Sequence, residues 1–104
     1  MAGQNLTPSS SVVFTTTGGA GNYDTVTFGS DGDYVDITAD PSNTGRVSLL
    51  VDPGATNPTV DGDGTVTVFP GGALLEPSKG RGNTVVKVIS STAGQRLALR
   101  VVNG

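Results

Sequence analysis

The side chains most able to do chemistry in this sequence are carboxylates. The tripeptide Asp-Gly-Asp occurs twice, at residues 31–33 and 61–63, and clustered carboxylate and carbonyl oxygens are the ligands that Ca²⁺ prefers. An EF-hand loop starting at Asp61 would need further ligands at the positions that Thr65 and Gly72 occupy. Because Asp and Gly are also typical turn residues, we predict that both segments form turns and that the protein binds no metal or other cofactor.

Two carboxylates on either side of a glycosidic bond can hydrolyse it. Here, however, most of the nine acidic residues lie in Asp-rich turns, and a chain of 104 residues offers little material for a deep cleft. The sequence contains no Cys and no His, which excludes thiolate nucleophiles, thiolate metal sites and the commonest general base. We therefore predict that the protein is not an enzyme and has no catalytic residue.

Composition also narrows the possible binding functions. A net charge of −3 disfavours nucleic acid, because phosphate neutralisation supplies most of that affinity. The basic segment 79–83 lacks the Gly-Lys-Ser/Thr end of a phosphate-binding loop. Sugar sites commonly use aromatic platforms, and the chain has no Trp and two tyrosines, Tyr23 and Tyr34. No apolar run is long enough to predict a membrane span.

The sequence pattern predicts short β-strands throughout the chain. Apolar and polar residues alternate in short runs, which Gly, Pro, Asp and Asn interrupt about every ten residues. No stretch has a sustained helical period. Strands are expected at 11–16, 24–28, 33–38, 46–51, 65–69, 73–76, 83–89 and 95–102, with a shorter run at 59–60. The fold class predicted is all-β, a small antiparallel sandwich or jelly roll, or a barrel, of about seven to eight short strands.

The most strand-like part of the chain is its C-terminal segment. Runs 83–89 and 95–102 are separated by a short loop that contains Gly94, so we predict a β-hairpin that anchors the core. Alternation places Leu97 and Leu99 on one face of the second run. Asp-Gly at residues 61–64, between β-prone runs, predicts another hairpin.

The first ten residues are polar and have no periodic pattern. We expect an N-terminal arm at 1–10, either disordered or bound to a neighbour, followed by a single β domain at 11–104. This N-terminus has neither a charged region nor an apolar region of the kind that directs Sec export, so synthesis in a cytoplasm is expected.

Charge is divided unevenly along the chain. Residues 1–76 contain all nine acids and one base, a net charge of −8, whereas residues 77–104 contain five bases and no acid, a net charge of +5. This asymmetry suggests association between unlike surfaces, either of copies of the chain or with an acidic partner. Pairing of the basic strands with acidic strands of the same chain explains it equally well.

Three segments resemble small β-rich proteins encoded among the structural genes of tailed bacteriophages: residues 64–72, 83–90 and 97–101. With the Thr/Ser/Pro-containing N-terminus, they make the chain similar in size and composition to capsid decoration, or cement, proteins. The resemblance covers about half of the chain. It implies a structural virion protein, made in the host cytoplasm, that binds the major capsid protein lattice on the outer head surface and stabilises the shell as a homotrimer.

Such a trimer would bury apolar faces between its subunits, and basic side chains would add charged contacts. A small carbohydrate- or protein-binding module of a tail or fibre, without catalytic activity, is the alternative. The residues expected at the subunit or capsid interface are Phe14, Phe69, Leu74, Leu75, Lys79, Arg81, Arg96 and Arg100.

Overall fold

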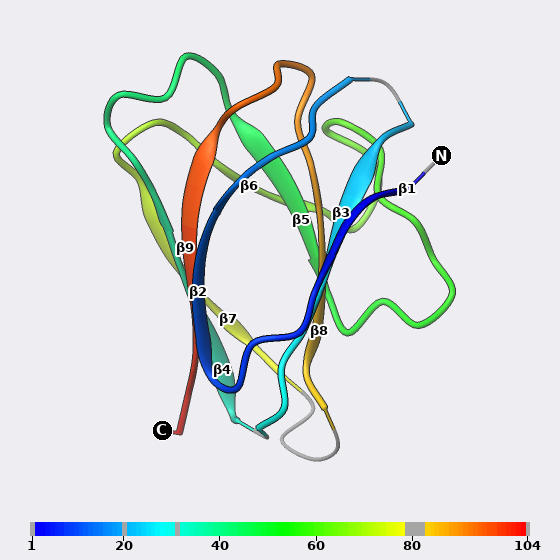
Figure 1. Ribbon diagram of the computed structural model, residues 1–104, viewed down its shortest axis with the longest axis vertical. Helices are drawn as coiled ribbons and strands as arrows, with labels where there is room; N and C mark the ends of the chain where they lie inside the picture. Colours follow the sequence, from blue (N-terminus) through cyan, green and yellow to red (C-terminus); the bar gives the residue numbers. More distant parts are fainter. Residues whose placement is uncertain (1, 20, 31, 79–82, 104) are drawn as a thin grey trace.

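The computed structural model describes residues 2–19, 21–30, 32–78 and 83–103. These residues form two β-sheets packed face to face, with no helix among them (Figure 1). The prediction of an all-β antiparallel sandwich is confirmed. Within the described ranges there is accordingly no helix of the length and hydrophobicity that crossing a membrane requires.

The nine described strands are divided between the sheets. One sheet has the order β1 (Ala2–Leu6), β3 (Tyr23–Thr27), β8 (Val85–Ile89), β5 (Val47–Val51) and β6 (Val66–Val68). The other has the order β2 (Ser11–Thr15), β9 (Arg96–Val102), β4 (Tyr34–Ala39) and β7 (Ala73–Pro77). Strands β2 to β9 match the expected runs to within two residues, whereas residues 59–60 form no strand.

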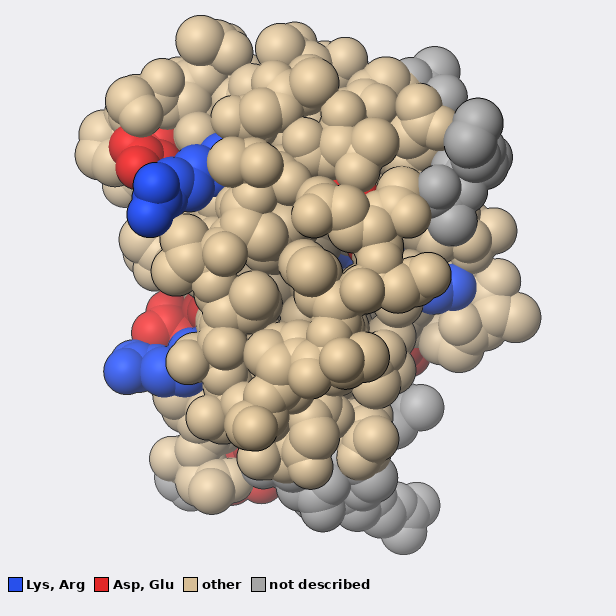
Figure 2. All heavy atoms as spheres, viewed as in Figure 1, with Lys and Arg blue, Asp and Glu red and all other residues tan. Residues whose placement is uncertain are grey.

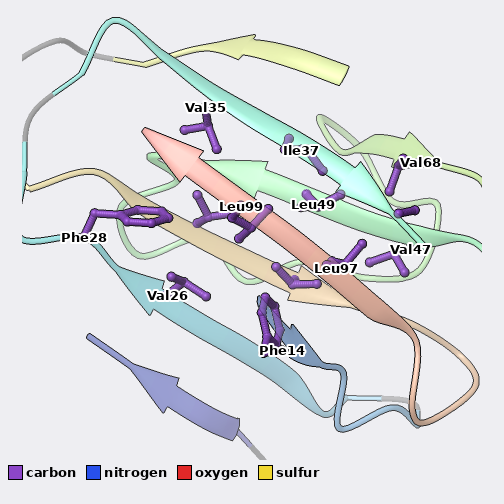
Figure 3. Close-up of a cluster of buried hydrophobic side chains, with 13 residues drawn as sticks. Phe14, Val26, Phe28, Val35, Ile37, Val47, Leu49, Val68, Leu97 and Leu99 are labelled. Carbon is purple, nitrogen blue, oxygen red and sulfur yellow. The ribbon is translucent and has the colours of Figure 1, made fainter. Parts of the chain in front are cut away.

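The core lies between the two sheets and is built from alternate residues of their strands. Figure 3 shows side chains from both sheets meeting in this space. Leu97 and Leu99 belong to this core, and they share a face as the alternation of their run predicts, since a strand places every second side chain on the same face. The core consists of Phe14, Val26, Phe28, Val35, Ile37, Ala39, Val47, Leu49, Val68, Val86, Val88, Leu97 and Leu99.

The predicted C-terminal hairpin is wrong, because β8 and β9 belong to different sheets. Strand β8 pairs with β3 and β5, whereas β9 pairs with β2 and β4. Val88 of β8 and Leu99 of β9 belong to one buried cluster. Two apolar strands placed in opposite layers can both bury their inward faces on the same core, and the chain therefore crosses between the layers.

Gln95 holds this crossing in place. Its side chain is buried, and its Oε1 accepts hydrogen bonds from the backbone N–H groups of Thr44 (2.8 Å) and Gly45 (2.9 Å). Its Nε2 donates to Thr44 Oγ1 (3.0 Å) and to the carbonyl of Ala93 (3.1 Å). Because both ends of the amide are bonded, the crossing buries a polar side chain without an unsatisfied group.

The predicted hairpin at residues 61–64 is also not formed, although the segment does turn. Strands β5 and β6 pair antiparallel, but residues 52–65 connect them. The turn brings the N–H of Thr65 to the carbonyl of Gly62 (3.2 Å), and Asp61 and Gly64 have φ of 53° and 77°. Asp and Gly tolerate this left-handed region, so residues 61–64 form a turn inside a longer loop.

The 52–65 loop lies against the outer side of β5 and β8 in the five-stranded sheet (Figure 1). The N–H of Asp61 donates to Ser48 Oγ (3.0 Å) in β5. Lys87 of β8 donates from Nζ to the carbonyls of Gly54 and Thr56 (both 3.1 Å) and to Asn57 Oδ1 (3.0 Å). The loop therefore shields this outer side, where Ser48 is itself buried.

Residues 2–6 belong to the sandwich, contrary to the predicted domain boundary after an arm at 1–10. Strand β1 runs parallel to β3 at one edge of the five-stranded sheet. The N–H of Gln4 donates to Asp24 Oδ1 (2.8 Å), and the same carboxylate accepts from the N–H (2.9 Å) and Oγ1 (2.5 Å) of Thr17. Backbone pairing and one buried carboxylate hold this strand, so it needs no apolar pattern.

Replacing Phe28 with alanine removes a fully buried ring from the core. We expect the free energy of unfolding to fall by about 3–5 kcal/mol, measured by urea denaturation. Phe69→Ala is the matched control, because Phe69 is 62% exposed, and its effect should stay within about 0.5 kcal/mol. Equal losses in the two variants would contradict this core assignment.

Asp24→Asn keeps the size of the side chain but directs an amide N–H₂ at groups that are themselves donors. We expect a loss of about 1–3 kcal/mol in the free energy of unfolding, with faster amide hydrogen exchange in β1 than in β4. Asp63→Asn, at an exposed turn residue, is the control. Unchanged protection of β1 would show that the carboxylate does not hold it.

Candidate functional site

The outer side of the four-stranded sheet is the surface that stands out. Its strands expose large apolar side chains, with Val13 55% and Leu75 56% exposed. We call this surface the open face. It consists of Ser11, Val13 and Thr15 of β2, Arg96, Ala98, Arg100 and Val102 of β9, Tyr34, Asp36 and Thr38 of β4, and Ala73, Leu75 and Pro77 of β7.

The strand register arranges the open face in rows across the four strands. The backbone N–H of Asp40, which directly follows β4, donates to the carbonyl of Arg96 (3.1 Å) and extends this register by one row. Read from β2 towards β7, the rows are Thr15-Arg96-Asp40, Val13-Ala98-Thr38-Ala73, Ser11-Arg100-Asp36-Leu75 and Val102-Tyr34-Pro77.

All bases of the open face lie on β9, and the acids beside them lie on or next to β4. Arg100 donates from a terminal guanidinium nitrogen to Asp36 Oδ2 (3.1 Å), and Arg96 Nε lies 4.0 Å from Asp40 Oδ2. Figure 2 shows two groups of basic and acidic atoms, one below the other, on the side where Figure 1 places β9 and β4. These contacts support pairing within the chain as one source of the charge asymmetry.

Hydrogen bonds from the N–H (2.8 Å) and Oγ (2.7 Å) of Ser42 are the main reason why the pKa of Asp40 is lowered, and Arg96 contributes less. Asp40 therefore stays ionised beside Arg96 under mildly acidic conditions. A fixed negative charge remains at this end of the open face.

The open face is hollowed on either side of Ala98, which is the smallest of the β9 side chains on this face. One open depression of about 470 Å³ reaches from Ser11 to Asp36 and Arg100, and another of about 280 Å³ lies towards Arg96. Val13, Thr38 and Ala98 line both. The small Ala98 between two long arginine side chains explains the hollow, which can receive a protruding side chain of a partner.

Of the eight interface residues predicted from the sequence, the structure brings Leu75, Arg96 and Arg100 together on the open face. Phe69 is exposed, but it lies in the turn between β6 and β7, outside this face. Lys79 and Arg81 lie outside the described residues.

Two of the predicted interface residues are corrected by the structure. Phe14 is 7% exposed and belongs to the core, and Leu74 is half-buried against it. Strand alternation is the physical reason, since it turns Phe14 inward and its neighbour Val13 outward, and likewise turns Leu74 inward and Leu75 outward. The apolar contact expected between subunits thus loses two of its four side chains.

Val13, Asp36 and Ala98 are members of the open face that sequence reasoning did not assign to an interface, and it considered Tyr34 only as a platform for a sugar. The sequence signal for Val13 is the alternation within 11–15. Phe14 is the larger apolar residue of that strand and is expected to face the core, which turns its neighbour Val13 outward. The rows that join these residues depend on strand order, which alternation does not specify.

The second Asp-Gly-Asp segment is engaged by an arginine. Arg46 Nε donates to Asp61 Oδ1 (3.0 Å) and Oδ2 (2.9 Å), and a terminal nitrogen also contacts Oδ2. These hydrogen bonds, together with the positive charge of Arg46, lower the pKa of Asp61. Asp31 of the first segment is outside the described residues, and within the described residues no group of three His, Cys, Asp or Glu residues could hold a metal ion.

Comparisons of the chain with protein-family models, with curated proteins and with solved structures gave no match. The functional argument therefore depends on the open face itself.

Arg46→Met should raise the pKa of Asp61 towards its ordinary value of 3.8. Because the folded-state pKa is lowered, the stabilisation by Asp61 is present above the unfolded pKa and is lost as the pH falls through the folded value. The variant should therefore lose less stability than the parent below pH 3.8. The pKa of Asp61 is measured by NMR titration of the parent and of the variant, and Asp40 is the internal control. An unchanged pKa of Asp61 would contradict the ion pair.

Proposed function

We propose that this chain is a structural virion protein, a decoration protein that binds the major capsid protein lattice on the outside of a bacteriophage head and stabilises the shell. It would act by binding other protein molecules and would catalyse no reaction. The observation that carries the proposal is the open face, an uncovered sheet surface that presents apolar side chains and ordered charges on a rigid sandwich.

The composition of the open face supports a contact between proteins. Large exposed apolar side chains that lie on one surface are typical of interaction sites. Arginine and tyrosine are enriched in protein interfaces, and this face contains Arg96, Arg100 and Tyr34. Its charges form ion pairs with one another, so a partner has to match a pattern of charges as well as an apolar shape.

The other sheet supports the same assignment by contrast. Its outer side carries the 52–65 loop, which engages Ser48 and Lys87. One sheet thus has the outer side of β5 and β8 covered by its own chain, whereas the other leaves Val13 and Leu75 exposed. We infer that a partner molecule covers these two side chains.

A decoration protein has to make two kinds of contact, with other copies and with the lattice, and the open face would supply one of them. It stabilises a shell by mass action, because binding to the assembled lattice and not to dissociated subunits shifts the equilibrium towards the shell. A stable scaffold and a matched surface are sufficient for this role.

Binding of a carbohydrate is the second candidate, and Tyr34 is the observation that favours it. Its ring is exposed on the open face, in the row next to the Asp36 and Arg100 pair. An aromatic ring beside charged hydrogen-bonding groups can stack on a sugar and orient it.

We expect the purified chain to bind saturably to heads from the phage that carries its gene, as measured by co-sedimentation. Calorimetry should show stabilisation of about 2.7 kcal/mol per site when the free chain is at 100 times its Kd. Val13→Glu, on the open face, should reduce uptake, whereas the control Phe69→Glu, on an exposed residue outside it, should not.

Absence of co-sedimentation would contradict the decoration proposal. The second candidate would be favoured if the chain does not bind heads but binds one glycan on an array, and if the Tyr34→Ala variant no longer binds that glycan.

A further inference from the structure

We propose that the open face binds the open face of a second copy of this chain, about a two-fold axis parallel to the strands and midway between β9 and β4. The inference rests on the proposed function only in that the open face is taken as a protein-binding surface, and it names the partner.

The direction of the axis follows from the separation of charge between the two central strands. Rotation about this axis lays β9 of one copy over β4 of the other and β2 over β7. Arg100 then faces Asp36 of the second copy, and Arg96 faces Asp40 of the second copy. Each of the two charged rows thus gains two pairs of opposite charges from one rotation, because the two bases lie on one strand and the two acids lie beside them.

The other two-fold axis in the plane of the face is excluded by the same charges. An axis perpendicular to the strands, through the row of Ala98 and Thr38, would exchange the rows above and below it. Arg96 would then lie over Arg100 of the second copy, and Asp36 over Asp40 of the second copy. Like charges that meet across an interface cost several kcal/mol.

The sizes of the side chains match about the same axis. Because β2 lies over β7, Val13 of one copy faces Ala73 of the other, and Leu75 faces Ser11. Each large apolar side chain of the outer strands therefore meets a small residue of the second copy. Ser11 also lines the 470 Å³ depression, which is where Leu75 of the second copy would be received.

The row at the far end of the face is apolar and matches as well. Tyr34 of β4 and Val102 of β9 are paired in the register, so the axis places Tyr34 over Val102 of the second copy. This contact covers the aromatic ring, and it adds an apolar contact beside the two charged rows.

Packing of sheet on sheet is a geometry that this fold already uses. Two packed sheets keep their strands within about 30° of each other and about 10 Å apart. The dimer would thus be four layers deep, with the two four-stranded sheets in the middle and the loop-covered sheets outside. Contacts with a capsid lattice would then fall to other surfaces, and the expected trimer is replaced by a dimer. Val13→Glu would in that case lower uptake on heads by separating the two copies that bind the lattice together.

Sedimentation equilibrium should give twice the monomer mass of 10.4 kDa, and Leu75→Glu should lower the association constant roughly a hundredfold. Phe69→Glu is the matched control, since it also places a carboxylate on an exposed apolar position, but outside the open face. Circular dichroism checks that each variant is folded.

The axis itself is tested by exchanging one ion pair, with Asp36→Arg and Arg100→Asp made together. This double variant keeps the pair within the chain and should self-associate as the parent does. Mixed with ¹⁵N-labelled parent, it should form mixed dimers about tenfold less favourably than either parent dimer or variant dimer, as counted by native mass spectrometry, because like charges then face each other.

The matched control exchanges the ion pair outside the open face, with Arg46→Asp and Asp61→Arg, and this variant should mix with the parent at random. The inference would be overturned if the parent chain stays monomeric or forms trimers. It would also be overturned if the open-face double variant forms mixed dimers with the parent as often as random mixing gives, or more often.

Binding to heads, measured in parallel, separates this inference from the proposed function. Monomers that bind heads through Val13 would overturn the dimer and leave the decoration role intact. Dimers that ignore heads would leave the inference standing and overturn the decoration role.

Discussion

The inward faces of β8 and β9 are buried in one core, and the two sheets are joined by this contact. Val86 and Val88 enter the core from one sheet, and Leu97 and Leu99 enter it from the other. Each of the two strands also has a hydrogen-bonded neighbour on both sides, so each is an interior strand of its sheet. The buried Gln95 amide fixes the crossing between them and ties it to Thr44.

That arrangement leaves each sheet with one outer side, and the chain treats the two sides differently. Lys87 fixes the 52–65 loop over the five-stranded sheet through three oxygen acceptors. The four-stranded sheet keeps Val13, Leu75 and its arginines exposed. A sandwich needs only its two inner faces to be stable, so an uncovered apolar outer face is free to serve binding.

Charge placement acts at two levels in this protein. Within the chain, bases on β9 lie beside acids on or next to β4, so the strongly asymmetric sequence folds without unpaired charge at this position. Ion pairs this exposed contribute little to stability, whereas their order across the sheet restricts which surface can pack on it. The distribution of charge therefore bears on the choice of partner more than on the stability of the fold.

Alternation and turn residues are local signals, and from them follow the fold class, the positions of β2 to β9 and the shared face of Leu97 and Leu99. It also singled out Leu75, Arg96 and Arg100. Local signals do not show that β8 and β9 lie in different sheets or that residues 2–6 form an edge strand, and both follow only from the folded structure. The physical reason is that strand order and the choice of partner depend on burial between segments distant in sequence, which local alternation does not encode.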